Sequence, residues 1–375
     1  MATRIPINSD LITWAIHRAG YELNEFLAKF PRVQQWINQE KQPTVKQLEN
    51  FSKKVHLPFG YLLLDEPPQE SLPIPFFRTQ SGVTDQVSLN VYDTIQLLKS
   101  RQEWLSSYLQ ENDYAPLEFV GQYKNAAVSE MVNSIRKKLD LAPDWAEQVS
   151  NWQAALNLLA ERTEEAGIVV TFNSVVGNNT SRPISVEECR GFVLVDKMVP
   201  FLFINAADAK AAQMFTLVHE LAHVWIGESA GFDQASLLPA DVETERLCDK
   251  VAAEFLVPAG TFTKVWREEK NFKKLGEKFK VSPIVVARRA LDLQKISKAE
   301  FFGFYNNYLR DVRNKKEQQG GGGDFYATAK KRVSLRFAAF VNRAVQQNEL
   351  PYREAYKLTN LKGETYRNFV EKHLL

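Results

Sequence analysis

The sequence predicts an α+β protein with an all-helical N-terminal bundle, a small sheet packed on one buried helix, and a helical C-terminal region. Three observations predict this class. Short amphipathic patterns fill residues 5–64. Runs rich in β-branched and aromatic residues at 168–172, 191–195 and 200–204 are typical of strands. Residues 214–227 are apolar nearly all round, which is typical of a helix inside a core.

Changes in composition divide the 375 residues into four expected parts. These are a helical module over 1–66, a proline-rich linker over 67–85, a mixed domain with a helical lead-in over 86–300, and a helical region with a glycine-rich loop over 301–375. Prolines cluster in the second part because they do not fit inside regular elements.

Charge and cysteine content narrow the class of protein. The net charge is only +2 and there are two cysteines, Cys189 and Cys248. A nearly neutral chain has no global attraction to nucleic acid or membrane, so any nucleic-acid contact needs a local patch. Two distant cysteines do not make a disulfide framework. With neither a signal peptide nor a membrane span in the sequence, we expect a cytoplasmic protein with both thiols reduced.

The pattern His-Glu-x-x-His occurs at His219, Glu220 and His223 inside the apolar helix. Residues four apart lie on one face of a helix, so both imidazoles can reach one metal ion. We expect Asn205 or Asp208 to cap this helix, and Gly227 to end it in a left-handed conformation. The alternative is a coincidental match in a core helix whose histidines are merely hydrogen-bonded. A third ligand decides between the two.

A second acidic helix, expected over 242–256 after a cap at Asp241, supplies that ligand. Glu245 follows His223 by 22 positions, which is enough for a loop and one helical turn to bring it back. A zinc site of two histidines and one glutamate leaves its fourth position for water. We therefore predict that His219, His223 and Glu245 bind Zn²⁺, with Glu243 as the other candidate for the third ligand.

Two further residues of these helices have predicted roles. Asp249, four residues after Glu245, is placed to accept the remaining ring proton of a ligating histidine. Glu220 is the predicted catalytic residue: it takes a proton from the activated water and passes it to the leaving amine. Hydrolysis of a peptide bond is the reaction that this set predicts.

The segments 215–223 and 245–258, Phe-Thr-Leu-Val-His-Glu-Leu-Ala-His and Glu-x-x-Cys-Asp-x-x-Ala-Ala-Glu-Phe-Leu-Val-Pro, resemble the ImmA/IrrE family of metallopeptidases. The resemblance extends over roughly residues 150–300. It implies a zincin-like domain that cleaves a regulatory protein such as a helix-turn-helix repressor. The family often has Asn where this chain has Asp249, and either residue accepts a histidine proton. The resemblance also implies a mobile-element, stress-response or toxin-antitoxin setting.

The N-terminal module resembles the Xre/Cro-like helix-turn-helix family in its order of Ala19-Gly20, Leu27-Ala28, Trp36-Ile37, Pro43-Thr44 and Leu57-Pro58. In that family the third helix reads DNA bases. We therefore name Arg32, Gln34 and Gln35 as DNA-binding candidates. The segment between the second and third helices is shortened here and contains Pro31, and positive and negative charges are nearly balanced. Protein binding or dimerisation is the alternative for the same module.

In zinc peptidases of this build, the edge strand beside the active-site helix binds the substrate by main-chain hydrogen bonds. The expected strand is Gly191, Phe192, Val193, Leu194 and Val195, or else the run 200–204.

Two function classes follow from these features. The first is a zinc endopeptidase whose partner is a protein substrate. The second is a DNA-binding antitoxin or transcriptional regulator that neutralises a toxin encoded nearby, with little or no proteolysis. In either class we expect DNA as a possible partner, a possible homodimer and no membrane association.

Overall fold

The computed structural model describes residues 3–72, 74–78, 82–84, 87–124, 126–232, 243–316 and 325–375. The chain divides into two compact units. The N-terminal unit is Met1–Pro73 with Asp85–Asp93, and the larger unit is Ile74–Thr84 with Thr94–Leu375. No helix in the described part of the chain is long and apolar enough to cross a membrane.

The N-terminal unit is a bundle of short helices. They are α1 (Ser9–Arg18), α2 (Leu23–Lys29), α3 (Pro31–Ile37), α4 (Val45–Lys54) and the 3-10 turn η1 (Phe59–Leu63). Asn8 caps α1 through its side chain, and Thr44 forms a capping box with Gln47 at α4. Pro31 opens α3, so a single residue separates α2 from α3. The short connection that the sequence predicts is confirmed.

The larger unit contains a six-stranded mixed sheet. Its strands are β1 (Phe76–Arg78), β2 (Gly82–Thr84), β3 (Val169–Asn173), β6 (Gly191–Leu194), β7 (Phe201–Asn205) and β8 (Ala230–Phe232), in the order β2-β1-β8-β6-β7-β3. Strand β6 is antiparallel to β7 and β8, while β3 runs parallel to β7. A separate pair, β4 (Val175–Val176) and β5 (Asn179–Pro183), follows β3. The strands expected at 168–172, 191–195 and 200–204 are confirmed as β3, β6 and β7.

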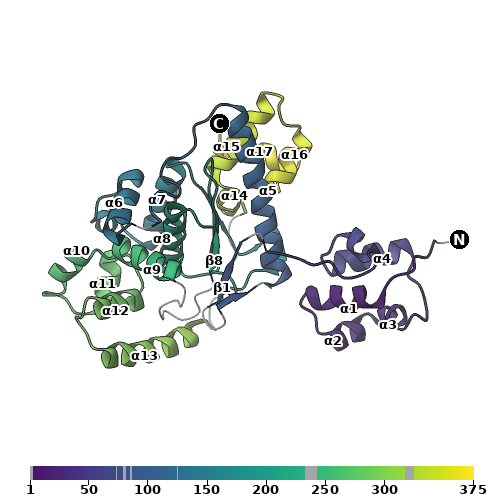
Figure 1. The fold of residues 1–375 in the computed structure, drawn as a ribbon, viewed down its shortest axis with the longest axis horizontal. Helices are drawn as coiled ribbons and strands as arrows, with labels where there is room; N and C mark the ends of the chain where they lie inside the picture. Colours follow the sequence, from purple (N-terminus) through teal and green to yellow (C-terminus); the bar gives the residue numbers. More distant parts are fainter. Residues whose placement is uncertain are drawn as a thin grey trace. The chain divides into compact units, whose positions relative to one another are not determined.

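Helices cover the sheet on both faces (Figure 1). On one side lie α6 (Val128–Leu139), α7 (Trp152–Glu165), α8 (Lys210–Ile226) and α9 (Glu243–Leu256), and on the other lie α5 (Leu89–Glu111) and the C-terminal helices. Further helices are η2 (Trp145–Gln148), α10 (Ala259–Val265), α11 (Phe272–Phe279), α12 (Pro283–Asp292) and α13 (Lys298–Lys316). Because both faces are covered, every residue of β3, β6 and β7 is buried.

The C-terminal region comprises α14 (Phe325–Val333), α15 (Leu335–Gln346), α16 (Tyr352–Thr359) and α17 (Glu364–His373). It packs against the rest of the larger unit. Phe337 contacts Phe201 of β7, with ring centroids 5.7 Å apart. The buried guanidinium of Arg101 donates hydrogen bonds to the carbonyl oxygens of Leu358 and Arg332. These contacts place the region in the core of the larger unit.

Four expectations, two of them about the N-cap of α8, need correction or lie outside the described residues. Ala209 is the N-cap of α8, without a side-chain bond. Asn205 instead binds the backbone of Ile184, Cys189 and Ala207, so it does not cap the helix as predicted. Asp208 accepts hydrogen bonds from the N–H of the next residue, Ala209, and from the guanidinium of Arg190, so it does not cap the helix either. The expected cap Asp241 and the glycine run 320–323 lie outside the described residues.

Candidate metal centre

Helix α8 holds the histidines in the middle of the core. It packs against β6 and β7 on one side and against α6, α7 and α9 on the other. Trp225 is buried, stacks on Phe119 at a centroid distance of 4.3 Å and donates its indole N–H to Ser134. Gly227 ends the helix in the left-handed region, with φ 88°, and its N–H binds the carbonyl oxygen of His223 at 2.8 Å. The predicted glycine cap is confirmed.

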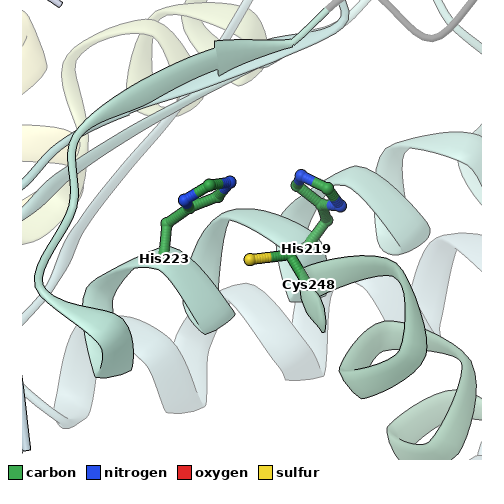
Figure 2. Close-up of side chains that lie close together, drawn as sticks. All are labelled: His219, His223 and Cys248. Atoms are coloured by element: carbon green, nitrogen blue, oxygen red, sulfur yellow. The ribbon is translucent and has the colours of Figure 1, made fainter. Parts of the chain in front are cut away.

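His219 and His223 leave α8 on the same side, one helical turn apart (Figure 2). Their ring centroids are 5.1 Å apart. Both side chains are at most 1% exposed. Two imidazoles buried this deeply need polar partners, because an unsatisfied polar group inside a core is costly.

Helix α9 supplies those partners. One oxygen of Glu245 lies 3.0 Å from Nε2 of His219, and its other oxygen lies 3.1 Å from Nε2 of His223. Asp249 approaches the opposite nitrogen of His219, with Nδ1 and Oδ1 3.1 Å apart. The structure therefore brings together the three predicted ligands and Asp249. Glu243, the other candidate for third ligand, is exposed at the first position of α9.

The donor atoms fit a tetrahedral cation. Bonds of about 2.0–2.1 Å to a tetrahedral zinc ion put any two ligand atoms roughly 3.3 Å apart. The two nitrogen–oxygen separations of 3.0 and 3.1 Å are close to this spacing. Among the described residues, neither nitrogen of His223 has an aligned hydrogen-bond partner, although Nε2 lies near Glu245. A cation bound to Nε2 and to the carboxylate would satisfy both groups.

The charges in this pocket are strongly coupled. Burial alone would raise the pKa of Glu245, but the hydrogen bonds and charges of His219 and His223 outweigh it and hold this pKa well below its usual range. Burial alone would lower the pKa of His219, but Asp249 and Glu245 outweigh it and raise this pKa well above its usual value. Both directions show that the pocket stabilises a positive charge beside the Glu245 carboxylate.

Glu220 lies in the same pocket and has a different environment. It is fully buried, and neither carboxylate oxygen has a hydrogen-bond partner among the described residues. Burial raises the pKa of Glu220 to about 8. Gly191 at the start of β6 faces it: a Cβ on that glycine would lie 3.3 Å from Oε1 of Glu220 and 2.5 Å from Cγ2 of Thr216. The missing side chain keeps β6 close to α8.

Cys248 is a residue of the site to which the sequence analysis gave no metal role. Its sulfur and one nitrogen from each of His219 and His223 all lie within 4.8 Å of one another. Figure 2 shows the thiol directed from α9 towards the two imidazoles. Burial raises the pKa of this thiol well above its ordinary value, and nearby Glu245 adds to the effect. Its position three residues after Glu245, on the same face of a helix, was the signal available in the sequence.

The prediction that β6 is an edge strand open to a substrate peptide is wrong. Strand β6, which contains Gly191, Phe192, Val193 and Leu194, is paired on both sides, with β7 and with β8. Val195 follows the strand, and its N–H binds the hydroxyl of Ser229. The alternative run at 200–204 is also internal, because β7 lies between β6 and β3. Strand β8 pairs with β6 on the side away from β7, and the hairpin β1–β2 extends the sheet beyond β8.

The DNA-binding candidates lie in the N-terminal unit, on α3. Arg32 and Gln34 are exposed, and Gln35 is half-buried. Gln34 donates a hydrogen bond to Asn38 four residues later. The exposed side chains of Arg32 and Gln34 are open to solvent.

A histidine pair and a glutamate from neighbouring buried helices define a metallopeptidase-like site, and comparison of sequences agrees. Residues 163–291 match a peptidase family model described as the IrrE N-terminal-like domain, which supports the ImmA/IrrE family of metallopeptidases. The match includes the whole of α8 and α9. Residues 333–372 match a second model, described as a domain of unknown function. No curated protein matches the chain. Neither matched segment includes the N-terminal unit, so its helix-turn-helix character stays a prediction.

Proposed function

We propose that this chain is a zinc-dependent endopeptidase that hydrolyses a peptide bond in a regulatory protein. One observation carries the proposal: the Glu245 carboxylate lies 3.0 and 3.1 Å from the Nε2 atoms of two histidines one helical turn apart. Glu220 lies in the same pocket, fully buried and without a hydrogen-bond partner among the described residues. The family match of residues 163–291 supports the same activity.

In this proposal His219, His223 and Glu245 hold the ion. Asp249 accepts the Nδ1 proton of His219, which leaves Nε2 of that ring with a free lone pair for the metal. When bound, a zinc ion supplies Lewis acidity, polarising a carbonyl oxygen and lowering the pKa of water towards neutrality. The adjacent positive charge also favours the ionised form of Glu220 over the protonated form that burial favours.

Glu220 is the general base. As a carboxylate it takes a proton from the attacking water at one of its oxygens, and it then gives that proton to the nitrogen of the leaving amine. Its lack of a competing hydrogen-bond partner among the described residues leaves both oxygens available for this transfer. Glu220 is buried among apolar residues, so bulk water does not compete with the leaving amine for the proton.

The proposed substrate is a helix-turn-helix repressor encoded near this chain, in a mobile-element, stress-response or toxin-antitoxin setting. The family resemblance supports this choice. To test it, we would measure zinc per chain and incubate the protein with the repressors encoded beside its gene. We expect one zinc per chain and cleavage of one repressor. Glu220→Gln should keep the zinc and lose cleavage by about 10²–10⁴-fold. A zinc-loaded chain that cleaves no neighbouring protein would contradict the proposal.

A second candidate function, DNA binding, is favoured by the exposure of Arg32 and Gln34 on α3 in a unit that has its own core. We propose that this unit binds DNA near its own gene, whether or not the larger unit neutralises a toxin. The test is gel-shift titration with the flanking DNA at several salt concentrations. Specific retardation that weakens in Arg32→Ala is expected, and no retardation at low salt would defeat it.

A further inference from the structure

The site holds one more potential ligand than an open catalytic zinc site requires. His219, His223 and Glu245 already supply three donors, and such sites keep the fourth position for water. Cys248 lies three residues after Glu245 on α9 and is fully buried on the same side of the helix. Its sulfur is within 4.8 Å of a nitrogen of each histidine.

A second observation, independent of the cysteine, is that buried polar atoms of this pocket lack aligned hydrogen-bond partners among the described residues. His223 is 1% exposed, and neither ring nitrogen has an aligned hydrogen-bond partner among the described residues. Oxygen Oε1 of Glu245 is buried and lies 3.1 Å from Nε2 of His223, but it too has no aligned hydrogen-bond partner among the described residues. A neutral thiol does not satisfy these atoms, since it is only a weak donor and acceptor. A cation among them would.

A cysteine sulfur is a suitable fourth ligand for a zinc ion that two histidines and a glutamate already bind. Zinc binds thiolates, and four-coordinate sites made wholly of protein ligands are closed to water. A tetrahedral ion with bonds of about 2.05 Å to nitrogen and 2.3 Å to sulfur needs the two atoms roughly 3.6 Å apart. In this chain the sulfur and one nitrogen of each histidine are at most 4.8 Å apart, so a side-chain movement of about 1 Å brings sulfur and nitrogen to this spacing.

We propose that Cys248 is a metal ligand whose thiolate competes with water for the fourth coordination position of the ion bound by His219, His223 and Glu245. The inference rests on the proposed zinc site. In the closed state a zinc–sulfur bond forms, the thiol proton passes to solvent and the water leaves. In the open state the sulfur regains a proton and water returns. Cleavage takes place only from the open state, so the Cys248 thiolate lowers the share of the chain that is active without abolishing cleavage.

The full-length, zinc-loaded chain provides the test through zinc K-edge X-ray absorption. We expect one sulfur neighbour at about 2.3 Å in the unmodified chain, beside nitrogen and oxygen neighbours at about 2.0–2.1 Å. Cys248→Ala should keep the zinc, lose the sulfur neighbour and show only nitrogen and oxygen. Cys189→Ala is the matched control: it removes the other buried cysteine, which lies on the loop before β6, and should keep the sulfur neighbour.

The outcomes separate the two proposals. Stoichiometric zinc with only nitrogen and oxygen neighbours in the unmodified chain would overturn the role of Cys248 and leave the peptidase proposal standing. A chain that binds no zinc would overturn both. The unmodified chain decides the matter, so the result does not depend on how well Cys248→Ala folds.

Discussion

The residues to which the sequence assigns functions lie on helices α8 and α9 of the larger unit and on helix α3 of the N-terminal unit, and the two groups of residues differ in burial. On α8 and α9, the residues His219, Glu220, His223 and Glu245 are at most 1% exposed. On α3, which follows α2, Arg32 and Gln34 are exposed. A buried polar group without a partner destabilises the fold, so the partners of the residues on α8 and α9 indicate what these residues do. Exposed polar groups form hydrogen bonds with water, so the exposure of Arg32 and Gln34 does not by itself indicate a function.

Removing Glu245 should have the largest effect. Glu245→Ala strips both histidines of their shared carboxylate and should abolish stoichiometric zinc binding. Breaking a buried charged pair on one side typically costs about 3–5 kcal/mol, so the metal-free chain should unfold at a lower urea concentration. Glu243→Gln, two residues earlier and exposed, is the control and should keep the zinc and change stability by less than about 1 kcal/mol. Equal effects of the two variants would mean that burial does not distinguish them.

Asp249 should contribute less, through His219. Asp249→Ala removes the acceptor for the Nδ1 proton and should weaken zinc affinity by about 10–100-fold, measured by competition with a chelator. Asp249→Asn keeps an acceptor oxygen and should stay close to the unmodified chain. If both variants bind zinc as tightly as the unmodified chain does, the Asp249 contact does not orient the ring.

Gly191 tests how tightly β6 packs on α8. A Cβ there would meet Thr216, the carbonyl oxygen of Phe203 and Glu220, so Gly191→Ala should destabilise the chain by about 1–3 kcal/mol. Gly260 in α10 has nothing within 4 Å of a built Cβ, and Gly260→Ala should be neutral or stabilising by up to about 1 kcal/mol. The measurement is the midpoint of chemical denaturation. A neutral Gly191→Ala would show that β6 yields easily.

The smallest effect on stability should come from α3. Arg32→Ala and Gln34→Ala change exposed side chains and should alter the free energy of unfolding by less than about 0.5 kcal/mol. The same variants should lower DNA affinity if the N-terminal unit binds DNA. A loss of stability instead would assign these residues to the bundle's own structure.

Local patterns predicted much of the larger unit. Strands β3, β6 and β7 lie within one residue of the runs at 168–172, 191–195 and 200–204, because β-branched and aromatic residues are concentrated there. The antiparallel pairing of β6 with β7 was likewise predictable, since a short connection joins them. In the candidate site, the four-residue spacing of His219 and His223 and the helical spacing of Glu245 and Asp249 sufficed to predict their convergence.

Contacts between distant segments were not predictable in the same way. Strand β8 pairs with β6, so β6 is not the edge strand that the sequence predicted. On its other side β8 pairs with β1, which lies more than 150 positions earlier in the chain. Asn205 has the composition of a helix cap, but buried carbonyl groups of Ile184 and Cys189 take its amide instead. The proximity of the Cys248 sulfur to the two histidines depends on the packing of α8 against α9, which local sequence patterns do not determine.

The central claim is that one zinc ion lies between α8 and α9. Anomalous diffraction at the zinc absorption edge, from crystals of the zinc-loaded full-length chain, tests it most directly. The account predicts a single strong peak within about 2.0–2.2 Å of Nε2 of His219, Nε2 of His223 and a carboxylate oxygen of Glu245. A peak elsewhere on the chain, or none in crystals grown with excess zinc, would contradict it.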